Sequence, residues 1–310
     1  MSLSFLVQAV TVIGLMCLVV SDNLRREPEV RFQTNSTYAH LSSAAFRSSG
    51  ARCRTVELTD AERLSRSVTL KTMAMSSIAL ADAPPEIKIH VHVITSSSGE
   101  GSVTPRSIKH QVKAMNWAYR DTPFRFTLAS SETTVNDDWY TSTPGSAANT
   151  AMKTALRSGS YQDLNIYTTV QSDMNLGWAT YPMSVDQEYS IDGVVVDYRT
   201  FPNDIFVPYN LGITSVHETG HWLGLQHTFS GGCDVNLDGG DMIGDTPAEA
   251  SANFGCPSSR NTCPGSAGAL AGDDPIHNYM DYSDDACMDH FTSDQRSSMI
   301  AHWQMYRAGK

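Results

Sequence analysis

The sequence is short of positive charge. Its 310 residues include 22 lysines and arginines against 33 aspartates and glutamates, which gives a formal net charge of −11 at pH 7. Proteins bind phosphate backbones mainly through lysine and arginine, so the absence of a basic patch argues against a nucleic-acid partner. The same acidic balance disfavours binding to anionic membranes, because like charges repel.

Repeats and long apolar runs are also scarce. No internal repeat is evident, which argues against a solenoid. Outside residues 3–20, no run is apolar enough to cross a bilayer. Hydrophobic residues nevertheless make up 41% of the chain and charged residues only 18%. This composition excludes wholesale disorder and allows a sizeable core.

The one long apolar run ends in the small side chains of Val19-Val20-Ser21. It predicts a secretory signal peptide over residues 1–21, although the usual basic segment before the run is missing. A membrane anchor is the alternative, because the run is long enough to span a bilayer. Asn35 lies in the sequon Asn35-Ser36-Thr37 and is a candidate glycosylation site. We therefore expect a secreted, extracellular monomer with no stable membrane association after the signal is removed.

Cysteine is rare before residue 230 and clusters after it. Cys17 leaves with the predicted signal peptide and Cys53 stands alone. The other four are Cys233, Cys256, Cys263 and Cys287. In an oxidising compartment such a cluster predicts two disulfides, for which three pairings are possible. A cysteine-rich zinc site is the competing interpretation, but the chain has no C-x-x-C pair.

The chain divides near Pro84-Pro85. Residues 22–85 are rich in Ser, Arg and Ala and contain one helix signal, the capping box Thr59-Asp60-Ala61-Glu62. We interpret residues 22–85 as a leader, or pro-segment, that cannot build its own core. Residues 86–310 are expected to form the main domain, with an N-terminal part over 86–227 and a C-terminal part over 228–310.

The N-terminal part alternates strand and helix signals. A β-branched strand at residues 87–94 carries His90 and His92 on one face, for which metal binding is the alternative to partial burial. Helix signals at 104–119 and 146–156 and apolar strands at 124–128, 164–170, 176–182 and 193–198 follow. This order predicts an α/β fold with a mostly parallel sheet. The strand near 176–182 is the candidate edge, where an extended peptide can add itself.

Residues 217–227 are the most informative stretch and read H-E-x-x-H-x-x-G-x-x-H. On a helix expected from Asn210 to Gly224, His217 and His221 lie on one face and can bind one ion, with Glu218 beside it. Gly224 lets the chain turn sharply, so His227 can supply a third ligand. Three histidines leave the fourth position of a zinc ion to water, as in a catalytic site. A helix that binds no metal is the alternative.

Two further motifs accompany this stretch. Asn278-Tyr279-Met280-Asp281-Tyr282 follows it, and Gly244-Asp245-Thr246-Pro247 lies among the four cysteines. Together the three motifs resemble the metzincin zinc metallopeptidases, specifically the pappalysin (M43) family that includes fungal extracellular metalloproteases. The resemblance implies an α/β (α+β metzincin-like) fold. Its parts are a twisted, mostly parallel sheet with an antiparallel edge strand, an active-site helix, and an irregular disulfide-stapled C-terminal part that ends in a helix.

The resemblance implies a secreted zinc endopeptidase with one Zn²⁺ per chain. Glu218 is then the general base and acid for a zinc-activated water, and Met280 belongs to a Met-turn packed beneath the metal. Tyr282 is assigned to the tetrahedral intermediate, with simple packing as its alternative. The implied disulfides are Cys233–Cys263 and Cys256–Cys287. A non-catalytic extracellular zinc-binding module and a zinc hydrolase of small amides or esters are the alternative functions.

Two further sites are also predicted. The Cys53 thiolate can occupy the open zinc position and keep a zymogen inactive, as leader cysteines do in some metzincins, whereas an unpaired or intermolecular cysteine is the alternative. A D-x-[DN]-x-[DN]-G pattern places Asp234, Asn236 and Asp238 at calcium-loop positions, with Asp245 at the twelfth. Related pappalysins hold calcium, so we expect Ca²⁺ there, against a merely solvated acidic turn.

Overall fold

The computed structural model describes residues 52–59, 61–63, 65, 86–171, 175–184, 189–202, 206–233, 240–266 and 270–310. These residues belong to one compact unit, His40–Lys310. The predicted signal peptide and Asn35 lie outside the described residues, as do Asp234, Asn236 and Asp238. No helix within the described part of the chain is long and apolar enough to cross a membrane.

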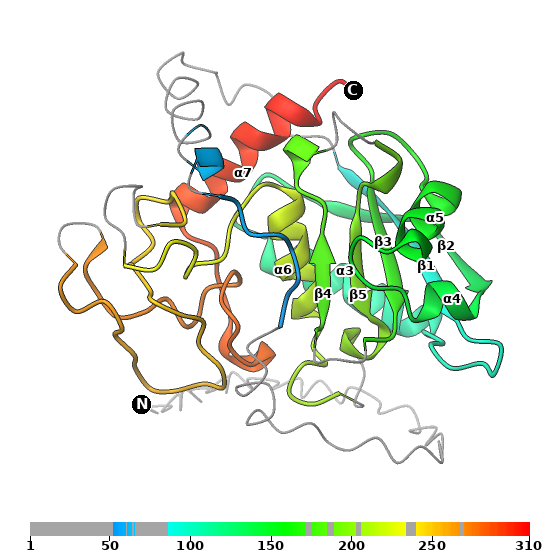
Figure 1. Ribbon diagram of the computed structural model, residues 1–310, viewed down its shortest axis with the longest axis horizontal. Coiled ribbons are helices and arrows are strands. Elements are labelled where there is room, and N and C mark those ends of the chain that lie inside the picture. Colours follow the sequence, from blue (N-terminus) through cyan, green and yellow to red (C-terminus); the bar gives the residue numbers. More distant parts are fainter. Residues whose placement is uncertain are drawn as a thin grey trace, which may run out of the picture. The chain divides into compact units, whose positions relative to one another are not determined.

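Five strands form one sheet in the order β2-β1-β3-β5-β4 (Figure 1). They are β1 (Ile87–Thr95), β2 (Phe126–Val135), β3 (Leu164–Thr169), β4 (Gly177–Ala179) and β5 (Val194–Asp197). All neighbours pair in parallel except β4, which pairs antiparallel to β5 at the edge. The mostly parallel sheet with an antiparallel edge strand is therefore confirmed.

The helices cover both faces of this sheet. They are α3 (Pro105–Ala118), α4 (Asp137–Tyr140), α5 (Ala147–Leu156), α6 (Ile213–Trp222) and α7 (Ser293–Tyr306). Alternate strand residues point to opposite faces. Thus Ile166 packs in the cluster that includes residues of α3, α6 and α7, whereas Tyr167 packs with Tyr140 of α4 and Met152 of α5.

Local hydrogen bonds explain where several elements begin. The Thr104 and Ser146 side chains cap α3 and α5, and Thr292 forms a capping box with Gln295 at the start of α7. Short 3₁₀ turns complete the fold, and they are η1 (Pro182–Ser184), η2 (Tyr189–Ile191), η3 (Tyr198–Thr200) and η5 (Asp285–Cys287).

Two predicted boundaries were wrong. Strand β2 continues to Val135 rather than ending at residue 128. Most of β2 is exposed at the sheet edge, so its polar side chains hide a strand that main-chain pairing with β1 sustains. Helix α6 begins at Ile213, after Gly212 in the left-handed conformation, and no side chain caps it. Asn210 is therefore not its cap.

A buried ionic cluster fixes the end of α6 against α7. The carboxylate of Asp192 accepts hydrogen bonds from Trp222 Nε1 at 3.0 Å and from the Arg307 guanidinium at 2.9 and 3.1 Å. The Arg157 guanidinium lies 3.3 Å from the same carboxylate. Asp192 and Arg307 are both fully buried. The metal-binding motif is thus carried by a helix whose C-terminal end is tied to two other segments.

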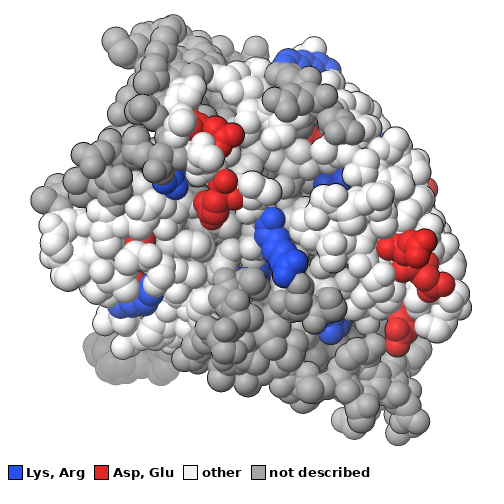
Figure 2. All heavy atoms as spheres, in the orientation of Figure 1, with Lys and Arg blue, Asp and Glu red and all other residues white. Residues whose placement is uncertain are grey.

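The C-terminal part is irregular until α7 begins. The disulfides Cys233–Cys263 and Cys256–Cys287 join its loops. On the face that Figure 2 shows, the basic and acidic side chains of the described residues are interspersed rather than gathered by sign. The expectation that no nucleic acid binds stays a prediction.

Candidate metal centre and active site

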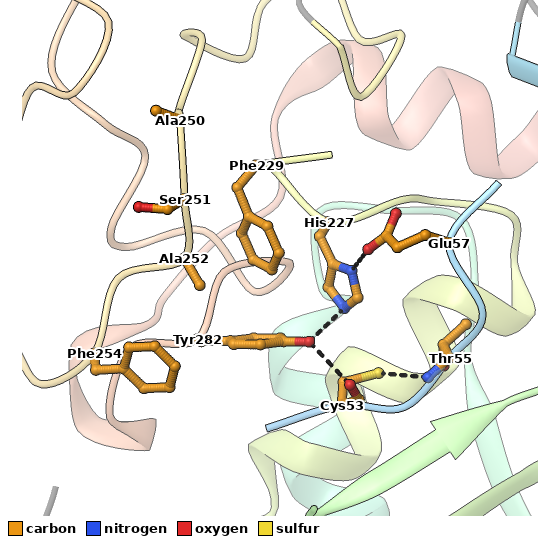
Figure 3. A pocket seen from close by; sticks show the side chains of 10 residues that line it. All are labelled: Cys53, Thr55, Glu57, His227, Phe229, Ala250, Ser251, Ala252, Phe254 and Tyr282. Carbon is orange, nitrogen blue, oxygen red and sulfur yellow. Dashed lines mark hydrogen bonds and ion pairs between the residues drawn. The ribbon is translucent and has the colours of Figure 1, made fainter. Parts of the chain in front are cut away.

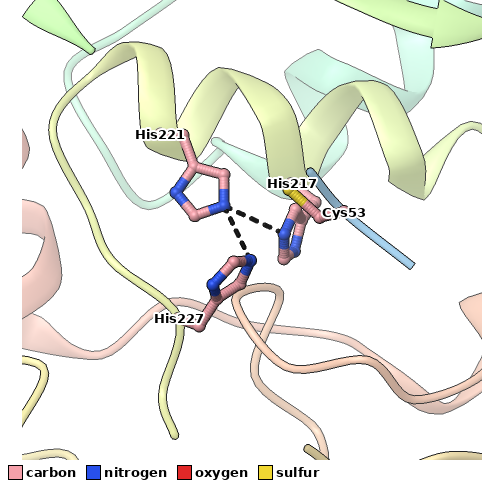
Figure 4. Close-up of side chains that lie close together, drawn as sticks. All are labelled: Cys53, His217, His221 and His227. Carbon is pink, nitrogen blue, oxygen red and sulfur yellow. Dashed lines mark hydrogen bonds between the residues drawn. The ribbon is translucent and has the colours of Figure 1, made fainter. Parts of the chain in front are cut away.

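Helix α6 and the turn after it bring three histidines together (Figure 4). His217 and His221 lie on one face of the helix, and their Nε2 atoms are 3.1 Å apart. Gly224 has a φ of +99°, a conformation that reverses the chain at the end of the helix. His227 therefore returns toward the helix, with its Nε2 atom 3.0 Å from that of His221.

The second nitrogen of each ring faces an oxygen acceptor. Nδ1 of His217 is 2.8 Å from the Tyr279 carbonyl, that of His221 is 2.7 Å from the Leu225 carbonyl, and that of His227 contacts the Glu57 carboxylate. We infer that each Nδ1 carries the ring proton, so that the three converging Nε2 atoms are unprotonated acceptors. Burial holds the pKa of His217 well below its usual value, which also favours a neutral ring at that position.

These three acceptors fit a zinc ion. Acceptors cannot hydrogen-bond one another, so their close approach calls for a cation between them. Tetrahedral zinc with bonds of about 2.0–2.1 Å places its nitrogen ligands about 3.3 Å apart. The observed separations of 3.0 and 3.1 Å are close to that spacing.

Glu218 lies beside the three imidazoles and is 1% exposed. Its Oε2 atom accepts from the Thr55 hydroxyl at 3.0 Å and from the Cys53 thiol at 3.4 Å. Its Oε1 atom has no hydrogen-bond partner among the described residues. Burial raises the pKa of this carboxyl to about 8. A carboxylate with an open oxygen at this place can take a proton from a nearby water.

Met280 lies beneath the histidines and packs against helix α6. It is fully buried, and a methyl group added to Gly220 would lie 2.4 Å from the Met280 sulfur. The thioether is therefore packed directly against the backbone of α6. Glycine at position 220 is what permits this close approach.

Tyr282 forms one wall of the site. Its hydroxyl lies 3.2 Å from Nε2 of His227 and donates to the Cys53 carbonyl at 3.1 Å. The ring of Phe229 stacks on His227 at an interplanar angle of 9° and meets Tyr282 edge to face. The phenol hydroxyl therefore lies at the histidine cluster and hydrogen-bonds a peptide carbonyl there.

Residues 52–57, from the predicted leader, lie in front of the histidines. Cys53 pairs in parallel with Gly177 of β4, the Leu176 amide donates to Arg52, and the Arg54 amide donates to Gly177. Figure 1 shows this blue segment beside β4 and α6. The predicted edge strand thus accepts an extended chain, and in this structure that chain is residues 52–54.

Arg52 is buried, and its contacts were missed by sequence reasoning. Its guanidinium donates to the Asp285 carboxylate at 2.7 Å and to the Ser283 carbonyl, and it lies 4.7 Å from the centre of the Tyr209 ring. Asp285 also accepts from the Leu211 amide. Arg52 and Asp285 are 233 residues apart, so no local pattern connects them.

Thr55 and Glu57 were missed as well. Thr55 accepts from the Ala179 amide at 2.8 Å while donating to Glu218. The polar residues Cys53, Thr55 and Glu57 alternate along the extended segment, and all three face the site (Figure 3). This alternation was the only signal in the sequence that could have revealed them.

Part of the cleft stays open beside residues 53–57. A cavity of about 670 Å³ lies between these residues and residues 250–254 (Figure 3). The aromatic rings of Phe229, Phe254 and Tyr282 line it, together with Cys53 and His227. Room for a longer ligand therefore exists next to the histidines.

Of the predicted calcium residues, only Asp245 is described. Its Oδ2 atom accepts from the Asp294 amide at 3.0 Å, whereas its Oδ1 atom is buried without a partner among the described residues. Oδ2 of Asp241 and Oε1 of Gln226 are likewise buried without a partner among the described residues. Burial raises the pKa of Asp241 well above its usual value.

Comparison with known proteins agrees with this site. The sequence profile of the M43 peptidases, described as Pregnancy-associated plasma protein-A, matches residues 155–304. An extracellular metalloprotease of Neurospora crassa is 44% identical over 241 residues, which cover 76% of this chain and 81% of that protein.

Solved structures share the fold. Mature mirolysin of Tannerella forsythia, in complex with a cleaved peptide, has a TM-score of 0.57 and 26% identity over 72% of this chain and 97% of its own. A promirolysin mutant from the same organism has a TM-score of 0.62 over 87% of this chain and 94% of its own, and at 24% identity this likeness shows the fold alone. With these similarities and the motif geometry, the chain belongs to the M43 family described as Pregnancy-associated plasma protein-A, and it is a metalloprotease.

Proposed function

We propose that this metalloprotease is a secreted zinc endopeptidase that cleaves peptide bonds of proteins. The observation that carries the proposal is the convergence of the Nε2 atoms of three histidines beside the buried side chain of Glu218, with His221 Nε2 3.1 and 3.0 Å from those of His217 and His227. His217, His221 and His227 would hold one zinc ion and leave its fourth position for water. The relatives named extracellular metalloproteases support secretion, with residues 1–21 as the signal peptide and Asn35 as a glycosylation site.

Glu218, Tyr282 and Met280 have different proposed roles in hydrolysis. When bound, zinc lowers the pKa of water at the site and polarises the scissile carbonyl. Glu218 takes a proton from the attacking water and passes it to the leaving amine. Tyr282 donates a hydrogen bond to the carbonyl oxygen, as its hydroxyl does toward the Cys53 carbonyl. Met280 keeps the histidines in place from below.

The substrate is proposed to lie extended along β4. The leader already uses the main-chain groups of Leu176 and Gly177 for this purpose. Mature mirolysin was solved with a cleaved peptide, which supports peptide binding in this fold. A zinc hydrolase of small amides needs no such edge, so the edge favours an endopeptidase.

The contact between Arg52 and Asp285 suggests which substrate side chains are preferred. Asp285 is buried and presents a carboxylate to a guanidinium at 2.7 Å. Once the leader leaves, the same carboxylate needs a new cation, because an unpaired buried charge is costly. We therefore expect preference for a basic residue near the scissile bond. Asp285→Asn should lower kcat/KM for an arginine-containing peptide more than for its norleucine counterpart.

Latency is the proposed role of residues 22–85, with 86–310 as the catalytic domain. The Cys53 sulfur and one ring nitrogen of each of the three histidines lie within 4.8 Å of one another, which supports a thiolate ligand at the open position of a bound zinc ion. Thr55 meanwhile bonds Glu218. Promirolysin matches a larger share of this chain than mature mirolysin does, which supports a pro-segment. If the Cys53→Ala precursor shows no more premature activity or self-cleavage than wild type, the thiol has no such role.

Calcium binding is proposed for the loop that ends at Asp245. Buried oxygens of Asp245, Asp241 and Gln226 that have no partner among the described residues support it, because such acceptors call for a cation or water. Asp234, Asn236 and Asp238 would complete the oxygen donors. Calcium titration should raise the melting temperature of the wild type but not of Asp245→Asn. An unchanged wild-type melting temperature would contradict the proposal.

A cleavage assay separates the candidate functions. The processed protein should cleave a denatured protein substrate, and a chelator should stop it. Glu218→Ala and the isosteric Glu218→Gln should both be inactive while still binding zinc. A non-catalytic zinc-binding module would cleave nothing in any form. Cleavage that persists in Glu218→Ala would overturn the mechanism.

A further inference from the structure

Glu57 of the leader contacts the metal site without approaching the metal position. One carboxylate oxygen accepts from Nδ1 of His227, and the other accepts from the Ser230 hydroxyl at 2.6 Å. Because both oxygens are engaged, the carboxylate is fixed relative to the ring. Figure 3 shows it on the side of His227 that faces away from Tyr282.

The three histidines differ in where their acceptors come from. His217 and His221 donate to the main-chain carbonyls of Tyr279 and Leu225, which belong to the same domain. His227 donates to a side chain 170 residues earlier in the chain. Removal of the leader therefore takes away the acceptor of one ligand and leaves those of the other two in place.

An acceptor on Nδ1 has a defined effect on a histidine ligand. It fixes the tautomer that leaves Nε2 free, holds the ring plane, and makes Nε2 more basic. Loss of such a partner typically weakens metal binding by about 10–100-fold. The Glu57 side chain is 46% exposed, so water can partly replace it and the lower end of that range applies.

We propose that Glu57 is a positioning residue for His227 that strengthens zinc binding in the precursor and is lost on maturation. The leader then helps the new chain to acquire and keep its metal, in addition to blocking the site. This inference rests on the proposed zinc site at the three histidines. It is separate from the Cys53 thiol, because the two residues reach the site at different atoms.

The test measures zinc affinity rather than activity. The full chain carries Cys53→Ala, to remove the sulfur ligand, and Glu218→Ala, to prevent self-cleavage. Zinc dissociation constants are determined by competition with a chromophoric chelator. We expect Glu57→Ala to weaken zinc binding about tenfold and Glu57→Gln, which retains a neutral acceptor, to weaken it less. Val56→Ala is the matched control, because this neighbouring side chain is 77% exposed and should leave the affinity unchanged.

Several outcomes are decisive. An affinity of Glu57→Ala equal to that of its parent would overturn the inference, as would an equal loss in Val56→Ala. The absorption spectrum of the cobalt-substituted chain should also change in Glu57→Ala, since the orientation of one ligand changes while the ligand set does not. If the parent chain binds no zinc, or if His227→Ala binds it as tightly, the proposed metal site itself fails.

Discussion

Gly224 is the residue on which the geometry of the third ligand depends, so its replacement by alanine is the most informative structural test. Its φ of +99° is a left-handed conformation that costs an alanine about 1–2 kcal/mol. The added methyl group would also lie 2.5 Å from the ring of His302 in α7. That ring is held by a hydrogen bond between Nδ1 and the Ser298 carbonyl at 2.8 Å, so it cannot move aside freely.

The two effects add to a substantial destabilisation. Overpacking of this kind costs about 1–3 kcal/mol, which brings the total for Gly224→Ala to about 2–5 kcal/mol. For a domain of this size each kcal/mol lowers the melting temperature by about 2–4 °C, so we expect a fall of about 10 °C. His227 should shift with the turn, and zinc affinity should fall with it.

Thermal melting and zinc titration of the full chain measure both consequences. Gly99→Ala is the matched control, because Gly99 has a φ of +88° but nothing within 4 Å of an added methyl group. It should lose only the 1–2 kcal/mol of backbone strain and should bind zinc normally. If Gly224→Ala has the same melting temperature as Gly99→Ala and binds zinc as tightly as wild type, the turn at Gly224 does not position His227.

Three further predictions concern stability. Asp192→Asn should destabilise the protein by about 3–5 kcal/mol in denaturant titration, because it leaves Arg307 and Arg157 buried without an anion. A loss below about 1 kcal/mol would show that this ionic cluster does not stabilise the fold. Replacing Cys256 and Cys287 by serine opens a disulfide with a sequence separation of 31 and should cost about 4 kcal/mol in the same assay, whereas no loss would mean that the unfolded chain is not constrained there. When free zinc is held at a hundredfold excess over its Kd, its removal by a chelator should lower the free energy of unfolding by about 2.7 kcal/mol and the melting temperature by about 5–10 °C. An unchanged melting curve would contradict a metal site in the folded protein.

Much of the site could be predicted because its ligands are local in sequence. His217, His221 and Glu218 lie within one helical stretch, and the glycine that returns His227 is part of the same motif. The capped helices α3, α5 and α7 were predictable for a similar reason, since each cap is a contact between residues three apart.

Contacts across long sequence separations could not be predicted in this way. Glu57 meets His227, Thr55 meets Glu218 and Arg52 meets Asp285 only because the leader adds itself to the edge of β4. The disulfide pairing likewise followed from family resemblance and not from spacing, because chain entropy allows all three pairings. Strand β2 escaped recognition over its second half, since an exposed edge imposes no apolar pattern.

His217, His221 and His227 are proposed to hold one zinc ion. Zinc-edge X-ray absorption of the full-length precursor tests it most directly, because the spectrum reports the ligand atoms themselves. We predict one zinc per chain with nitrogen ligands at about 2.0–2.1 Å and one sulfur at about 2.3 Å, and loss of the sulfur contribution in Cys53→Ala. A chain that holds no zinc, or one whose zinc environment is unchanged when His217, His221 and His227 are replaced by alanine, would contradict the account.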